Sequence, residues 1–335
     1  VEVVGADHQN KPDIGSNITR QWYDTDKVDM IADVPTSSVG LAVAQISKEK
    51  GKLHVNSGSA TADLSGKACN ANTIHWTYDT WMLANGTGKA IVKSGGNTWF
   101  FLTADYAFGH ALERDTEAVV TQNGGRVVGK VRTPFPTQDF SSFLLQAQSS
   151  KAKIIGLANA GGDTTNSIKQ AAEFGITKGG QNLAGLLVFL PDVHALGLNI
   201  AQGLMLTETF YWDLNDQTRT WTKRFSASNG GKHPSMVQAG VYSSVLHYLK
   251  AVDAAKTDDG TKVAAKMKEL PTDDVLFGKG SVRADGRKIH PAYLFEVKKP
   301  SESKGPYDYY KLVATIPANE AFRPLAESDC PLVKK

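Results

Sequence analysis

The fold is decided by a strand-to-loop pattern that is clearest in residues 98–109, Thr98-Trp99-Phe100-Phe101-Leu102-Thr103-Ala104-Asp105-Tyr106-Ala107-Phe108-Gly109. The apolar run Trp99–Leu102 predicts a strand, and the mixed residues Thr103–Gly109 predict the loop that follows it. The same pattern recurs at three other places, Ile31–Val34, Lys52–Val55 and Ile154–Leu157. Each loop is followed by a helical pattern, and strands that alternate with helices predict an α/β fold with parallel sheets.

The loops that follow these strands carry hydrogen-bond donors but no group that could readily break a covalent bond. They consist of small hydroxyl residues, glycines and aromatics in Pro35–Ser38, Asn56–Thr61, Thr103–Gly109 and Ala158–Asp163. In an open parallel sheet, ligands bind beyond the carboxyl ends of the strands. Backbone N–H groups, hydroxyls and helix N-termini in such loops hold small anions. The pattern therefore indicates a binding protein rather than an enzyme.

Length and composition favour a globular protein of two lobes. The 335 residues are too many for one typical core, and 41% hydrophobic with 21% charged residues is ordinary for globular chains. The formal charge of +3 is too small to indicate nucleic acid as a partner. No apolar run approaches the roughly 20 residues that a membrane span needs. The sequence shows no signal peptide, so if the protein is secreted we expect this to be its mature form.

The two cysteines, Cys69 and Cys330, lie far apart in polar, loop-like surroundings. Free cysteines are usually buried as small hydrophobic residues. A pair in polar loops fits one long-range disulfide and an oxidising compartment. The alternative is two unrelated thiols.

Several chemistries lack their sequence signatures. The eight histidines form no HExxH pattern and no pair at metal-ligand spacing, so we expect no metal site. The chain also has no GxSxG elbow and no GxGxxG loop. We therefore expect no catalytic residue and no cofactor.

The remaining pattern continues the alternation and ends in strands. Val1–Gly5 predicts an opening strand, Thr80–Lys93 a helix, and Leu183–Leu190 a strand. Three further strands predict an antiparallel tail, at Gly280–Arg283, Ala292–Val297 and Tyr309–Val313.

Taken together, these segments resemble the periplasmic solute-binding proteins of ABC transporters. The similar group is the leucine/isoleucine/valine-binding type, also called type I or the extracellular ligand-binding receptor family. The segments that carry the resemblance are Ala6–Asp13, Val28–Ile31, Asn56–Thr61, Thr103–Gly109 and Ile168–Gly175. The resemblance implies an α/β fold of two doubly wound lobes that close on a ligand. Three hinge crossovers would join the lobes, near Asp79–Trp81, Tyr211–Asn215 and Lys288–Pro291.

The resemblance also implies how the chain divides. We expect residues 1–80 and 212–289 in the first lobe, and residues 81–211 and the tail strands of 290–320 in the second. Residues 321–335 would be a C-terminal tail tied to the first lobe by the disulfide. Family members normally begin with one more βα unit, so we expect that this chain lacks the first one.

By resemblance, the ligand contacts loops of both lobes. In the first lobe, hydroxyls and backbone N–H groups would hold a carboxylate; the residues are Thr36, Ser37, Ser38, Ser57, Gly58, Ser59, Ala60 and Thr61. In the second lobe the expected residues are Tyr106, Phe108, Asn159, Ala160, Gly161, Asp163, Phe189, Phe210, Tyr211 and Trp212. Ordinary turns and caps use the same residue types, and Asp163 also suits a helix N-cap.

Two stretches favour an aromatic ligand within this family. His75–Thr80 and Phe210–Asp213 resemble an aromatic-acid subgroup of the benzoate or hydroxycinnamate kind. Amino-acid binders place an acid after the strand matched by Leu183–Leu190, where it pairs with the ligand ammonium. Because this chain has no acid before Asp192, we expect a carboxylate without an amine.

The expected function is therefore the capture of a small carboxylate, expected to be aromatic, for an ABC importer. Its partners would be the ligand and the membrane subunits of an ABC permease, and the protein would be a periplasmic monomer. The alternatives are a branched-chain or other amino acid binding protein, a ligand-sensing regulatory protein of the same fold, and an enzyme on a two-lobed scaffold.

Overall fold

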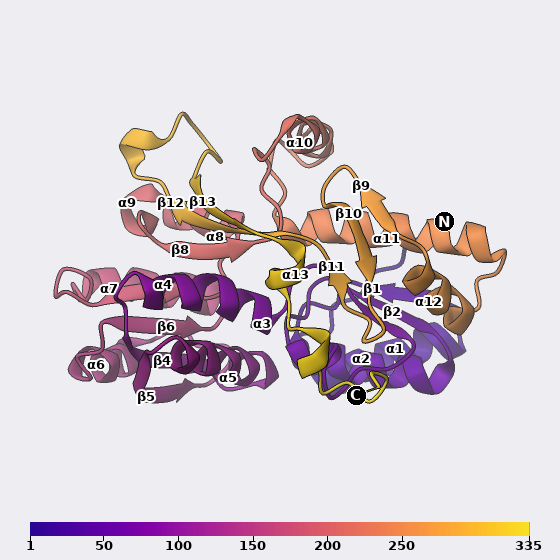
Figure 1. The fold of residues 1–335 in the computed structure, drawn as a ribbon, viewed down its shortest axis with the longest axis horizontal. Helices are drawn as coiled ribbons and strands as arrows, with labels where there is room; N and C mark the ends of the chain where they lie inside the picture. Colours follow the sequence, from indigo (N-terminus) through magenta and orange to yellow (C-terminus); the bar gives the residue numbers. More distant parts are fainter. Residues whose placement is uncertain (335) are drawn as a thin grey trace. The chain divides into compact units, whose positions relative to one another are not determined.

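The computed structural model describes residues 1–334, which form two compact units (Figure 1). Unit 1 comprises Val1–Asp79, Val237–His290 and the tail from Arg323. Unit 2 comprises Thr80–Met236 and Pro291–Phe322. The chain therefore passes from one unit to the other after Asp79, Met236, His290 and Phe322.

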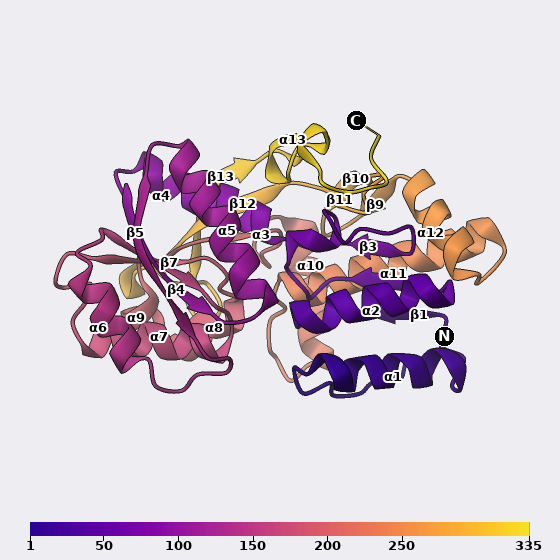
Figure 2. The ribbon, with the colours of Figure 1, turned by 90° about the horizontal axis from the view of Figure 1, so that it is seen from below.

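Unit 1 contains a parallel sheet in the order β1 (Met30–Ala32), β2 (Leu53–Asn56), β3 (Thr73–His75). Helices α1 (Pro12–Asp24) and α2 (Ser37–Lys50) lie side by side (Figure 2) and share a core with β1. Helices α11 (Met236–Ala255) and α12 (Gly260–Glu269) share a second core with β2 and β3. In this short sheet the carboxyl ends of β1 and β2 lie next to each other.

A small antiparallel sheet and the tail complete unit 1. The sheet has the order β11 (Lys288–Ile289), β10 (Gly278–Val282), β9 (Thr272–Asp274). The tail, which includes the 3₁₀ turn η4 (Leu325–Glu327), is joined to the rest of unit 1 by a disulfide between Cys69 and Cys330. Their Cα atoms are 5.5 Å apart, and the predicted disulfide is confirmed.

Unit 2 contains two sheets. The first is parallel, in the order β5 (Arg126–Thr133), β4 (Thr98–Ala104), β6 (Ile154–Ala158), β7 (Asn182–Gly185). Its helices include α5 (Ala107–Gln122), α6 (Ser141–Ser149) and α7 (Gly162–Glu173). The second is antiparallel, in the order β13 (Tyr310–Ile316), β12 (Ala292–Val297), β8 (Met205–Glu208). The further helices are α8 (Leu190–Leu196), α9 (Leu198–Ala201), α10 (Asp216–Ser228) and α13 (Ala318–Ala321).

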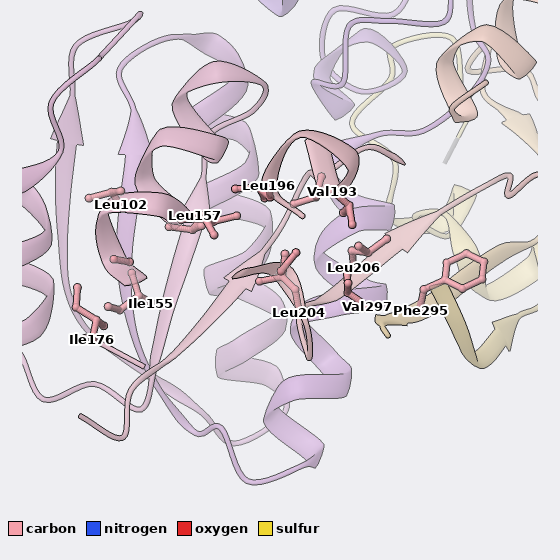
Figure 3. Close-up of a cluster of buried hydrophobic side chains, with 14 of the residues drawn as sticks. Leu102, Ile155, Leu157, Ile176, Val193, Leu196, Leu204, Leu206, Phe295 and Val297 are labelled. Carbon is pink, nitrogen blue, oxygen red and sulfur yellow. The ribbon is translucent and has the colours of Figure 1, made fainter. Parts of the chain in front are cut away.

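One hydrophobic core joins the two sheets of unit 2 (Figure 3). Leu102, Ile155 and Leu157 of the parallel sheet belong to the same cluster as Val193 and Leu196 of α8. From the antiparallel sheet, the cluster takes Leu206, Phe295 and Val297. The strands that carry the loops at the carboxyl end of the parallel sheet are therefore held by this hydrophobic core.

The helix expected over Thr80–Lys93 is present but interrupted. It consists of α3 (Thr80–Leu83), a π-helical turn η2 (Ala84–Gly88) and α4 (Lys89–Lys93). A Cβ on Gly86 would come within 2.7 Å of the Thr207 methyl group, so the close approach of β8 requires glycine. The hydroxyls of Thr87 and Thr207 lie 2.8 Å apart across the same contact.

Three expectations about elements and boundaries are wrong. Val1–Gly5 forms no strand, and Val1 and Val3 are exposed because β1 pairs only with β2 in this part of the structure. The strand expected over Leu183–Leu190 ends at Gly185. Residues 212–236, expected in the first lobe, belong to unit 2, where Trp221 of α10 packs against Phe210 at 5.8 Å.

Candidate ligand-binding loops

The loop after β2 in unit 1 is held in shape by its own side chains. Asn56 donates from Nδ2 to the carbonyl oxygen of Ser59 (2.7 Å) and accepts at Oδ1 from the Ser59 N–H (3.1 Å). The His75 ring nitrogen Nε2 lies 2.9 Å from the same carbonyl oxygen. The Tyr78 hydroxyl donates to the carbonyl oxygen of Gly58 (2.7 Å). This loop is therefore a rigid platform at the carboxyl edge of the sheet.

Most hydroxyls of the expected first-lobe group already bond within unit 1. Ser59 Oγ donates to the Val34 carbonyl oxygen (2.5 Å), and Thr36 Oγ1 donates to Asn10 Oδ1 (2.5 Å). Three further hydroxyls are engaged: Ser57 Oγ lies 3.3 Å from Ser244 Oγ, Ser37 Oγ accepts from the Thr61 N–H, and Thr61 Oγ1 accepts from the Asp63 N–H. These hydroxyls fix the loops to each other.

One set of donors left at this edge lies at the start of α2. The first bond of this helix runs from Gly40 N–H to Thr36 O (2.8 Å), and no side chain caps the preceding amides. These amides belong to Ser37, Ser38 and Val39. Ser38 is half-buried, and its hydroxyl has no hydrogen-bond partner within residues 1–334. An uncapped helix N-terminus with an adjacent hydroxyl attracts a small anion.

Gly58 and Asp33 show why this edge is shaped as it is. A Cβ on Gly58 would lie 2.8 Å from both Asp33 Oδ1 and Pro35 Cα, so the two loops meet closely only because residue 58 is glycine. Asp33 has a left-handed backbone (φ 52°), and its Oδ1 is buried without a partner in the described structure. Burial raises the pKa of Asp33 to about 6. Sequence reasoning missed this acid, because the predicted strand Ile31–Val34 contains it, whereas β1 ends at Ala32.

In unit 2 the loop after β4 presents an aromatic group. The Tyr106 ring stacks on Phe135, with centroids 4.2 Å apart and planes 18° apart, and it is tilted against Phe108 at 5.8 Å. Phe108 itself is buried in the packing of unit 2, with 2% of its surface exposed. Phe135 follows β5 and was missed, because the sequence places it in a proline-flanked loop without a strand signal.

The loop after β6 contains the expected Asn159, Ala160, Gly161 and Asp163. Asn159 is buried and engaged, since its Oδ1 accepts from Thr164 Oγ1 (2.7 Å). Ala160 is half-buried, and Gly161 has a φ of 58°, a left-handed conformation in the turn that precedes α7. Asp163 is not the N-cap of α7, because Gly161 occupies that position.

Asp163 instead ties two loops of unit 2 together. Its Oδ1 accepts from the Thr137 N–H in the loop after β5 (3.1 Å). Its Oδ2 is buried and has no partner among residues 1–334. Burial raises the pKa of Asp163, and the Thr137 N–H opposes that shift. Tyr106, Phe135, Thr137 and Asp163 thus form one connected group at the carboxyl edge of neighbouring strands.

Three other expected aromatics, Phe210, Tyr211 and Trp212, lie at a different edge, after β8, and Phe189 lies after β7. Phe210 is fully buried against Trp221. The Tyr211 hydroxyl and the Trp212 indole N–H both donate to the carbonyl oxygen of Tyr307, at 2.8 Å each. Tyr211 and Trp212 therefore hold the loop that precedes β13. Phe189 is half-buried at the start of α8, where its N–H donates to Asp192 Oδ2 (2.9 Å).

Two acids near these elements, Glu208 and Asp192, were not among the ligand-binding residues expected from the sequence. Glu208, at the end of β8, accepts from the Tyr310 hydroxyl (2.9 Å). Burial raises its pKa to about 8, and burial raises the pKa of Asp192 to about 6. The residues around Glu208 and Asp192 show no alternation of apolar and polar side chains that would distinguish these acids from acids on the surface.

The described residues contain no cluster of three metal-ligating side chains, and no helix among them is long and apolar enough to cross a membrane. The two loop groups offer hydrogen-bond donors, acceptors and aromatic rings. They can bind a small polar molecule.

Known proteins share this fold over almost the whole chain. A family model described as periplasmic binding protein matches residues 1–305. A crystal structure of a periplasmic binding protein from Burkholderia mallei is 54% identical, with a TM-score of 0.97, and the match covers 99% of this chain and 88% of that one.

Two more solved structures extend the comparison. A branched chain amino acid ABC transporter periplasmic ligand-binding protein from Burkholderia xenovorans LB400 is 41% identical over 98% of this chain and 88% of that one, with a TM-score of 0.85. An ABC transporter solute binding protein from R. palustris in complex with benzoate is 20% identical over 99% and 88%, with a TM-score of 0.86. At that identity the likeness concerns the fold alone. The predicted α/β fold of the type I kind is confirmed.

Proposed function

Since this chain belongs to the periplasmic binding protein family, whose similar members are ligand-binding proteins of ABC transporters, we propose that it captures an aromatic carboxylate. The ligand would be of the benzoate or hydroxycinnamate type. The protein would work in the periplasm as a monomer, would deliver the ligand to the membrane subunits of an ABC permease, and would catalyse no reaction.

The carboxylate end of the ligand would bind to the start of α2 in unit 1. The uncapped amides of Ser37 and Ser38 and the hydroxyl of Ser38 are the donors at that edge. Charge-assisted hydrogen bonds to a carboxylate are the strong ones, and the positive end of a helix adds to them. The loop Ser57–Thr61 would shape this site through its backbone, since its hydroxyls are largely engaged.

The ring of the ligand would bind to the aromatic group of unit 2. The single observation that carries the proposal is the stacked pair of Tyr106 and Phe135 at the carboxyl edge of the parallel sheet. Aromatic pairs contribute roughly 0.5–1.5 kcal/mol each beyond the area they bury. Phe189 and Trp212, both half-buried, remain candidates for further contacts.

A second candidate is a branched-chain amino acid. Asp192 lies in the connection after β7, where amino-acid binders place the acid that pairs with the ligand ammonium. Burial raises the pKa of Asp192 to about 6. The relative from B. xenovorans is named for branched-chain amino acids. The ammonium group of an amino acid would form an ion pair with the Asp192 carboxylate.

A thermal-shift screen separates the two candidates. At 100 times its dissociation constant, a ligand raises the free energy of unfolding by about 2.7 kcal/mol. We expect benzoate and 4-hydroxycinnamate to raise the unfolding temperature, and leucine to leave it unchanged. The proposal fails if leucine stabilises the protein while both aromatic acids have no effect.

A further inference from the structure

One carboxylate oxygen of Asp163, in the group formed with Tyr106, Phe135 and Thr137, accepts no hydrogen bond from the described residues. Asp163 is 3% exposed, and its Oδ1 accepts from the Thr137 N–H at 3.1 Å. Its Oδ2 is buried and has no hydrogen-bond partner in the part of the chain that the structure describes. A buried acceptor left without a donor destabilises the protein, because the loss of hydration is not compensated. Asp163 therefore holds a loop in place with Oδ1 while Oδ2 stays without a donor. This arrangement indicates that a ligand supplies the donor for Oδ2.

The Tyr106 hydroxyl is the second polar group here without a partner. No hydrogen bond to it occurs within residues 1–334, although the residue is half-buried and its ring is stacked on Phe135. Burial raises its pKa, and the charge of Asp163 raises it further, so the two groups interact electrostatically without being bonded to each other. One donor and one acceptor are therefore available beside the same aromatic surface.

We propose that Asp163 and Tyr106 recognise a hydroxyl group on the ring of the ligand. The hydroxyl would donate to Asp163 Oδ2 and accept from the Tyr106 hydroxyl, while the ring rests on the aromatic pair. This inference rests on the proposed function and narrows it to hydroxylated aromatic acids. Asp163 would be a specificity-determining residue that distinguishes these acids from unsubstituted ones.

A neutral hydroxyl fits this position better than an ammonium group. Ammonium recognition usually combines a carboxylate with several further acceptors, whereas the charge of Asp163 acts on the hydroxyl of Tyr106, which can donate. A phenolic hydroxyl is donor and acceptor at once, so it can satisfy both groups with a single atom. The aromatic pair beside them suits the ring that carries it.

The test compares benzoate, 3-hydroxybenzoate, 4-hydroxybenzoate and 4-methoxybenzoate by calorimetric titration of the full chain. The methoxy compound keeps an acceptor but has no donor. We expect one hydroxybenzoate to bind at least tenfold more tightly than benzoate, and 4-methoxybenzoate to bind no more tightly than benzoate. In Asp163→Asn the amide oxygen can still accept from Thr137 N–H, but the NH₂ group cannot accept from the ligand, so the hydroxyl preference should fall to about one.

Two further variants make the result specific. Tyr106→Phe keeps the ring and removes the hydroxyl, so it should reduce the affinity ratio of the hydroxybenzoate to benzoate. Asp105→Asn, an exposed acid paired with His110 at 2.7 Å, is the matched control and should keep the full preference. Thermal unfolding without ligand checks that each variant is folded.

The outcomes separate this inference from the proposed function. Equal affinity for benzoate and both hydroxybenzoates in the parent protein overturns the hydroxyl inference alone. A preference that survives Asp163→Asn, with the variant folded, overturns the role of Asp163. If no aromatic acid binds at all, the proposed function fails and this inference fails with it.

Discussion

Arg287 donates from Nη2 to the carbonyl oxygen of Trp76 at 2.9 Å, although the two residues are 211 positions apart. The same guanidinium donates to the carbonyl oxygens of Tyr78 (3.1 Å) and Lys288 (3.2 Å), and its Nε lies 3.6 Å from Asp79 Oδ2. Arg287 is completely buried in unit 1. It therefore joins the segment that leaves unit 1 after Asp79 to the segment that leaves it after His290.

Replacing this guanidinium should strongly destabilise the protein. Arg287→Met keeps much of the side-chain volume but removes the donors to three carbonyl oxygens and the partner of a buried acid. Breaking a buried pair of this kind costs about 3–5 kcal/mol. Urea unfolding should show a lower midpoint. Arg126→Met, at an exposed arginine, is the control and should change the free energy of unfolding by less than about 0.5 kcal/mol.

The disulfide should contribute to stability through the tail. Reduction of Cys69–Cys330 would release the segment from Arg323 and cost about 2–5 kcal/mol. Thermal unfolding with and without a reductant measures the effect. The double variant Cys69→Ser, Cys330→Ser should show the lower stability at once and no response to reductant. Two titratable thiols in the denatured, unreduced protein would contradict the assignment.

Asp33 should make stability depend on pH. Its folded-state pKa of about 6 lies above the ordinary value of 3.8, so the folded protein binds this proton more tightly than the unfolded chain. The contribution is fully present below pH 3.8 and is lost as pH rises through about 6, by up to about 3 kcal/mol.

The variant Asp33→Asn tests this sign. It should be more stable than the parent at pH 8, with the difference shrinking toward pH 4, and asparagine tolerates the left-handed backbone at this position. Asp258→Asn, at an exposed acid, serves as the control. A gain of equal size at both pH values would exclude Asp33 titration as the cause.

Ser38 and Ser59 should respond differently to loss of the hydroxyl. Ser59→Ala removes the donor to the buried Val34 carbonyl, so it should lower the free energy of unfolding by about 1–3 kcal/mol while the folded protein keeps its affinity. Ser38→Ala should leave stability unchanged and weaken binding of an aromatic acid about tenfold or more, the loss of one bond to a carboxylate. Calorimetric titration and urea unfolding of both variants give the two readouts. If Ser59→Ala alone weakened binding, the carboxylate would lie on the Ser57–Thr61 loop instead.

The alternation of apolar runs and loops was sufficient to predict the class of fold and the edges at which the loops gather. Strands β2, β4 and β6 are buried throughout, so their apolar runs are unbroken and easily recognised. Val1–Gly5 has the same composition but lies outside any sheet, because pairing depends on a neighbouring strand that local sequence does not reveal. Leu186–Val188 is likewise buried without strand pairing.

Side-chain roles within the loops were much less predictable. A serine or threonine hydroxyl can form a hydrogen bond to the protein or to a ligand, and the sequence does not show which. Only the structure shows that the Ser59 hydroxyl donates to the Val34 carbonyl oxygen, whereas the Ser38 hydroxyl has no partner within residues 1–334. The sequence also did not predict the burial of Arg287 and Lys288. Two adjacent cationic residues normally indicate a segment that is exposed to solvent. Asp33 escaped notice because its significance depends on the neighbouring Gly58.

The interleaving of the two units has a consequence for how the chain is made. Residue His75 of β3 pairs with Arg287, and the antiparallel sheet of unit 2 needs Ala292–Val297 and Tyr310–Ile316. On a ribosome, neither unit can therefore complete its core until nearly the whole chain has been synthesised. Contacts between residues so distant in sequence also form slowly. The topology thus delays the completion of either core to the end of synthesis, later than in a protein of two consecutive domains.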